Sequence, residues 1–127
     1  METVIRIVAG FLLFAHGLVH LLYLAPEADD PSYPFTLETS WLLPESARRP
    51  VALALMTATV GAFALLAMAV WGVPGLSALW PVIAAAASIL SLALLIAFWD
   101  TRLLFGVVID LAVIVVAVVR PGWTDAI

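Results

Sequence analysis

The residues with the clearest capacity for chemistry in this sequence are two histidines and one aspartate that stand inside apolar runs. His16 and His20 are four residues apart within the run from Val4 to Leu24. Four residues make about one helical turn, so both imidazoles project from one face of a helix. Asp110 stands in another apolar run. Ionisable side chains inside a membrane span are costly, and they mark candidate functional sites.

An isolated carboxylate in hydrocarbon is so costly that Asp110 must be either protonated or paired with another polar group. We expect His16 to be its first partner, with His20 and Ser91 next. The competing interpretation is structural, because polar side chains within spans often only cross-link helices through hydrogen bonds. The sequence favours a functional role for His16 and Asp110, and a structural role for the serines and threonines.

Several chemistries are open to such a site. Histidine is an axial ligand of haem, but two histidines on one helix face cannot clamp one haem, so a bis-histidine haem b would need a second subunit. The two histidines and the aspartate would suffice as metal ligands, yet histidines at this spacing also occur without metal, and we expect none. A His–Asp pair in a dry pocket also suits general acid–base work. No nucleophile motif or phosphate loop points to a named reaction.

The composition is that of a membrane protein. Of 127 residues, 65% are hydrophobic and 11% are charged, whereas a soluble domain is about 45–50% apolar and about 25% charged. The five basic residues are scattered arginines, so the chain has no basic patch for nucleic acid. The sequence contains no cysteine, which excludes disulfides, thiolate metal ligands and covalently attached c-type haem.

Four predicted membrane spans must position the candidate site. They cover residues 4–24, 51–71, 79–99 and 103–119, and each is about long enough to cross the hydrocarbon core. Short turns after the second and third spans make consecutive spans antiparallel neighbours. We therefore predict an all-α fold, an integral membrane four-helix bundle in up-down-up-down order, that forms a single domain over residues 1–127.

This arrangement predicts a polar layer beneath the long loop 25–50. The loop and the short turn after the third span lie on the same membrane face. Counted from that face at about 1.5 Å per residue, polar side chains of all four spans lie about 6–12 Å deep. The layer comprises His16, His20, Thr57, Thr59, Ser91 and Asp110. In the loop, Phe35 and Trp41 suit the headgroup zone, and we expect them to form a lid over the site.

The first span carries glycines, the last two turns are short, and the last span opens with Gly106-Val107-Val108-Ile109-Asp110. In these features the chain resembles small four-span bacterial membrane proteins of the DoxX-like family. The resemblance covers the span pattern across most of the chain, and the two histidines depart from the family's usual first-span motif. Some members are linked to quinone-dependent redox partners, so the resemblance implies a redox role as one alternative.

The residues together predict a small multi-pass protein, and the lysine-free composition is typical of a prokaryotic source and hence of the inner (cytoplasmic) membrane. We expect a non-catalytic subunit, or a protein that binds a small apolar ligand at a buried His/Asp site. Its partners are the lipid bilayer and either further copies of itself or a larger membrane complex. The first alternative is a haem- or quinone-associated redox subunit. The second is an acid–base enzyme acting on a lipid-like substrate.

Overall fold

The computed structural model describes residues 1–24 and 40–127, and these residues form helices and connecting turns without any strand. The four long helices are α1 (Glu2–Val19), α2 (Glu45–Val70), α3 (Trp80–Ala97) and α4 (Leu104–Val119). Short 3-10 segments adjoin them: η1 (His20–Leu24), η3 (Ser77–Leu79), η4 (Thr101–Leu103) and η5 (Gly122–Ala126). With the adjoining 3-10 segments included, all four helices are long and apolar enough to cross a membrane.

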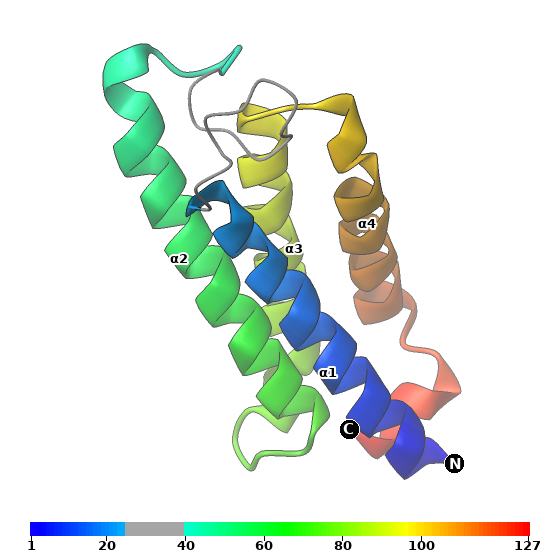
Figure 1. Ribbon diagram of the computed structural model, residues 1–127. Coiled ribbons are helices and arrows are strands. Elements are labelled where there is room, and N and C mark those ends of the chain that lie inside the picture. Colours follow the sequence, from blue (N-terminus) through cyan, green and yellow to red (C-terminus); the bar gives the residue numbers. More distant parts are fainter. Residues whose placement is uncertain (25–39) are drawn as a thin grey trace.

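The helices run up-down-up-down, with each packed against the next along the chain (Figure 1). The turn between α2 and α3 is tight because Gly72 and Gly75 adopt positive φ angles of 92° and 85°, which L side chains rarely adopt. The two termini lie at the same end of the bundle, and η5 packs against α1. By contrast, α1 and α4 pack only sparsely against each other. The bundle is therefore left open along one side.

The helix boundaries differ from the predicted spans mainly at the start of the second helix. α2 begins at Glu45, six residues before the predicted start at residue 51. The expectation that the loop extends to Pro50 is therefore wrong, since Pro50 lies inside the helix. Pro44, with extended backbone angles, precedes the first helical residue. At the end of the first span, the predicted single helix tightens into η1 from His20 onward.

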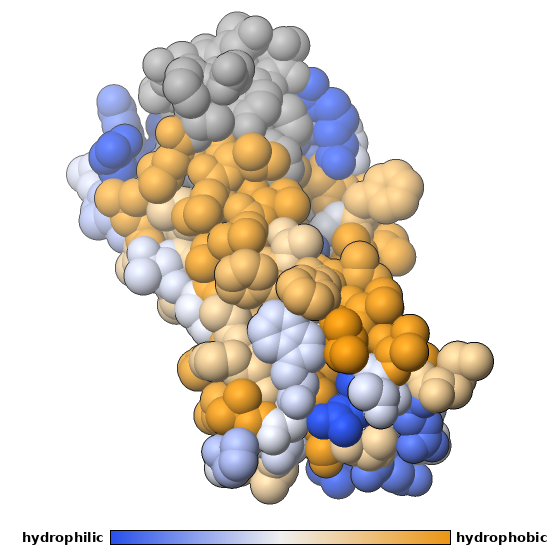
Figure 2. All heavy atoms as spheres, turned by 60° about the horizontal axis from the view of Figure 1, so that its bottom comes forward, coloured by the Kyte–Doolittle hydropathy of each residue, from blue (hydrophilic) through white to orange (hydrophobic). Residues whose placement is uncertain are grey.

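The outer surface of the bundle is apolar over its middle. Figure 2 shows hydrophobic side chains covering this part of the visible face, with hydrophilic residues gathered towards the two ends. Large side chains such as Phe105 and Val118 are 83% and 76% exposed. Such a broad exposed apolar area is typical of a surface that contacts lipid. The fold therefore agrees with the membrane-protein composition.

Inside the bundle, two apolar clusters are separated by a polar layer. The cluster nearer the termini comprises Phe63, Leu66, Ala69, Val70, Trp80, Ala84, Ala87 and Ala117. The cluster nearer the long connection comprises Tyr23, Ala52, Met56, Leu94, Ala97 and Phe98. Along α3, Ser88 and Ser91 lie between the members of the two clusters, and both serines are completely buried. The candidate site is built in this layer.

Candidate functional site

Asp110 joins the last helix to two other helices. Its side chain is fully buried at 0% exposure on α4. One carboxyl oxygen, Oδ1, lies 2.9 Å from Nε2 of His16 on α1. The other, Oδ2, lies 2.5 Å from Oγ of Ser91 on α3. The costly burial of this carboxyl group is thus offset by hydrogen bonds at both of its oxygens.

His20 extends this set of contacts on the far side of Ser91. Its Nε2 lies 2.7 Å from Ser91 Oγ, and its Nδ1 lies 3.1 Å and 3.2 Å from the backbone carbonyl oxygens of His16 and Gly17. His20 is only 2% exposed. His16, Asp110, Ser91 and His20 therefore form one continuous hydrogen-bonded series, which we call the polar cluster.

Phe63 of α2 fixes the positions of both imidazoles. Its ring centroid lies 5.0 Å from that of His16, nearly perpendicular to it, and 6.3 Å from that of His20, nearly parallel to it. This packing requires a glycine at position 17, because a Cβ atom there would lie 2.6 Å from the Phe63 Cβ. Gly17 thus lets α1 approach α2 closely enough for Phe63 to support the cluster.

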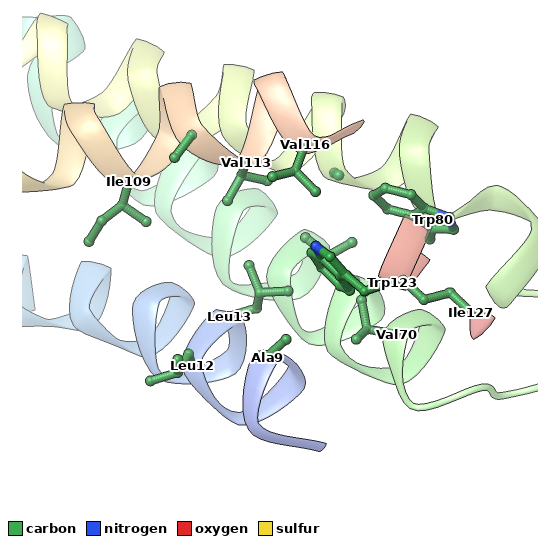
Figure 3. Close-up of a pocket in the computed structure, with 13 residues that line it drawn as sticks. Ala9, Leu12, Leu13, Val70, Trp80, Ile109, Val113, Val116, Trp123 and Ile127 are labelled. Atoms are coloured by element: carbon green, nitrogen blue, oxygen red, sulfur yellow. The ribbon is translucent and has the colours of Figure 1, made fainter. Parts of the chain in front are cut away.

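A first pocket of about 270 Å³ opens between α1 and α4, on the terminal side of the polar cluster. In Figure 3, Leu12 and Leu13 of α1 lie opposite Ile109 and Val113 of α4. Two tryptophans, Trp80 and Trp123, lie towards one end of the pocket. Every lining residue is alanine, leucine, isoleucine, valine or tryptophan. The pocket occupies the side on which the bundle is left open, so it faces the outer surface of the bundle.

A second pocket, of about 180 Å³, lies along the same seam on the other side of Asp110. Its walls include both imidazoles of the polar cluster. The remaining lining is apolar except for Arg102, whose guanidinium is paired with Asp100 at 2.8 Å. His16 keeps 9% of its side chain exposed, and its Nδ1 has no hydrogen bond to the described residues. His16 is therefore the member of the cluster that keeps the most exposure, and it lines this pocket.

Two predicted site residues stand apart from the cluster, and a third lies outside the described part of the chain. Thr57 is exposed on α2, so the expectation that it joins the polar layer is wrong. Its neighbour Thr59 is buried instead and donates to the Leu55 carbonyl, which satisfies the hydroxyl within its own helix. Trp41 is 69% exposed and donates to the Ile96 carbonyl. It lines neither pocket of the seam, and Phe35 lies outside the described residues.

The sequence reasoning missed the first pocket. Its lining residues are interspersed with exposed residues on helices that are apolar all round, so no hydrophobic periodicity distinguishes the two sets. Ser88, which the sequence places with Ser91 on the packing face of the third span, is fully buried and has no hydrogen-bond partner among the described residues.

The histidine geometry bears on the haem and metal hypotheses. Each histidine directs Nε2 at a partner within the bundle, Asp110 for His16 and Ser91 for His20. A metal ion or haem iron at either Nε2 would have to displace one of these hydrogen bonds. Among residues 1–24 and 40–127, no group of three or more acidic, histidine or cysteine side chains is placed to hold a metal ion.

No protein-family model, curated protein or solved structure matches this chain. The functional argument therefore depends on the geometry of the bundle.

Proposed function

We propose that this protein binds a small apolar ligand within the membrane, in the pocket between α1 and α4. The observation that carries this proposal is the first pocket, which is lined entirely by apolar side chains and opens where the bundle is unclosed. Binding sites for apolar molecules are concave, with mostly apolar walls and a few polar groups beside them. Here the polar cluster lies between the first and the second pocket, and Ile109 lines both of them.

The setting that we propose is the bacterial inner (cytoplasmic) membrane. The four apolar helices support a membrane location, and the resemblance to DoxX-like proteins supports the finer assignment. We propose further that the protein acts as a non-catalytic subunit, in a homo-oligomer or a larger membrane complex. The two alternatives from the sequence, a haem- or quinone-associated redox subunit and an acid–base enzyme, remain as competing proposals.

Intrinsic fluorescence tests ligand binding directly, because Trp80 and Trp123 line the pocket. Changing the other three tryptophans, Trp41, Trp71 and Trp99, to phenylalanine leaves these two as reporters. The protein is placed in nanodiscs and titrated with a brominated fatty-acid methyl ester, whose heavy atoms quench nearby indoles. We expect quenching that saturates and that the unbrominated ester reverses.

A pair of matched substitutions separates the pocket from bulk lipid. Ala112→Phe places a ring in the pocket wall, whereas Ala58→Phe places the same ring at an exposed position of α2 that lines neither pocket. We expect Ala112→Phe to remove the saturable quenching and Ala58→Phe to retain it. Quenching that rises linearly with the ester and is equal in all variants would show that the tryptophans sense only the bilayer, and it would overturn the proposal.

A further inference from the structure

The two pockets lie end to end along the seam between α1 and α4. On α1, Leu13 lines the first pocket, and His16, nearly one helical turn further on, lines the second. On α4, Ile109 lines both pockets. The hydrogen bond between His16 and Asp110 crosses from one helix to the other at this level. The pockets are therefore two parts of one seam, separated by a polar contact.

The His16–Asp110 bond is supported on both sides of the seam. Asp110 also contacts Ser91 and is thereby anchored to α3. The His16 ring packs edge-to-face against the rings of Phe63 and His20, with centroid distances of 5.0 Å and 5.3 Å. These contacts hold the imidazole across the seam.

An alkyl chain that lies in the first pocket gains nothing by crossing this bond. Separation of His16 from Asp110 would leave a buried carboxyl oxygen and a ring nitrogen unpaired, which costs the desolvation of both groups. A methylene group does not offset this cost, because lipid tails are as apolar as the wall of a protein pocket. The end of the chain should therefore stop on the first-pocket side of the bond.

The other end of the first pocket lies towards the end of the bundle that holds both termini, where Trp80 and Trp123 line it (Figures 1 and 3). Tryptophan is enriched where a membrane meets water. No charged or hydroxyl side chain among the described residues lines this pocket, so a polar head group has no partner inside it. A ligand with one alkyl chain would thus keep its head at the tryptophan end and direct its tail inward.

We propose that the His16–Asp110 bond sets the length of the alkyl chain that this protein binds. The ligand is a single-chain amphiphile, with its head near Trp80 and Trp123 and the end of its tail against the polar cluster. This inference rests on the proposed function, and it names the class of ligand and the pair of residues that selects it.

The length of the first pocket gives the expected size of the tail. On α4 its lining extends from Val116 to Ile109, which corresponds to about 10 Å at about 1.5 Å per residue. Carbon–carbon bonds of about 1.5 Å advance about 1.3 Å each in an extended chain, so about eight carbons fill this length. A tail of about sixteen carbons would have to enter the second pocket or leave the seam.

The test uses methyl esters with chains of eight or sixteen carbons that carry a photoreactive diazirine on the last carbon. The protein in nanodiscs is irradiated with each ester, with and without an excess of the plain eight-carbon ester, and mass spectrometry identifies the labelled residues. Label that the excess ester removes marks a saturable site, whereas label from bulk lipid is not removed. Leu13 reports the first pocket, and Val19 and Gly106 report the second, since each lines only one of them.

Two substitutions change the bond in different ways. His16→Ala removes the imidazole that crosses the seam. Asp110→Asn is the matched control, because a side-chain amide both donates and accepts and so keeps a hydrogen bond to either tautomer of the His16 ring. The comparison of the two esters in the wild type tests the proposal by itself, even if His16→Ala does not fold.

In the wild type and in Asp110→Asn, we expect the eight-carbon ester to give removable label at Leu13 and the sixteen-carbon ester to give none at Val19 or Gly106. In His16→Ala, the sixteen-carbon ester should give removable label at Val19 and Gly106.

Removable label at Val19 and Gly106 in the wild type would overturn the length selection and leave the binding proposal standing. The same conclusion follows if these two residues stay unlabelled in a His16→Ala protein that still gives the Leu13 label. If the excess ester removes no label from any residue of the first pocket in the wild type, the ligand-binding proposal fails, and the length selection fails with it.

Discussion

At the scale of single residues, Asp110 contacts His16 of α1 and Ser91 of α3 from its place on α4, so one carboxyl group links three helices. The two helices that flank the open seam share few other contacts. The His16–Asp110 hydrogen bond therefore spans the opening, and it divides the seam into an apolar pocket and a pocket with polar access. Removal of this bond should loosen the seam more than the rest of the bundle.

The two buried serines of α3 permit a matched comparison. Ser91→Ala removes the bridge between Asp110 and His20 and leaves a buried donor or acceptor unpaired on each side. We expect it to lower the free energy of unfolding by about 1–3 kcal/mol. Ser88→Ala deletes a hydroxyl that has no partner among the described residues, so it should be neutral or slightly stabilising. Unfolding in a detergent series measures both, and equal effects would contradict the importance of the Ser91 contacts.

At the scale of elements, glycine decides how closely α1 and α2 approach. Gly17→Ala places a methyl group 2.6 Å from the Phe63 Cβ, so the two helices must separate. We expect a loss of about 1–3 kcal/mol in the free energy of unfolding, as for other overpacked cores. Gly61→Ala, with no atom within 4 Å of the added Cβ, should instead stabilise α2 by up to about 1 kcal/mol.

The same two variants can be compared by ¹⁵N NMR of the histidine side chains, because the chain contains only two histidines. Since Phe63 supports both rings, Gly17→Ala should shift the ¹⁵N signals of His16 and His20, whereas Gly61→Ala should leave them unchanged. Unchanged signals in Gly17→Ala would mean that the helices absorb the added methyl group elsewhere.

The turn before α4 has an acid-sensitive cap. Asp100 accepts hydrogen bonds from the backbone and the guanidinium of Arg102, and these bonds lower its pKa below the usual 3.8. A carboxyl group with a lowered pKa stabilises the folded state above its ordinary pKa, and that stabilisation is lost as the pH falls through the lowered value. Asp100→Asn should therefore unfold more readily at neutral pH and match the wild type in strong acid. A stability difference that is the same at every pH would contradict this assignment.

At the scale of the whole molecule, the up-down-up-down order places both termini at one end of the bundle and the α3–α4 turn at the other. The chain lacks cysteine, so single cysteines report their own accessibility. Cysteines at Thr3 and Asp125 should react with a membrane-impermeant reagent from one side of a sealed vesicle. Cysteines at Ser46 and Thr101 should react from the opposite side. Labelling of Thr3 and Asp125 from opposite faces would contradict a four-span arrangement.

Much of the helical architecture could be predicted because it depends on local properties of the chain. The length and hydropathy of four runs predicted four helices, and short turns predicted antiparallel neighbours. The predicted boundaries failed at α2, because Pro50 was taken as the end of a loop although it is the sixth residue of the helix, a position where proline removes a backbone hydrogen bond and is uncommon. Thr57 was misplaced for a related reason. In a helix that is apolar all round, depth can be counted from the sequence, but the direction of a side chain cannot.

The sequence by itself determined that the chain has four runs long and apolar enough to span a membrane, that its helices alternate in direction, and that His16, His20, Ser91 and Asp110 lie at comparable depths. These properties follow from residue type and from distance along the chain. Only the tertiary structure decided that Ser91 lies between Asp110 and His20, that His16 lines a pocket, and that α1 and α4 stand apart. These depend on how each helix is rotated about its axis. That rotation is set by the close packing of small residues such as Gly17, because lipid contact favours no single apolar face.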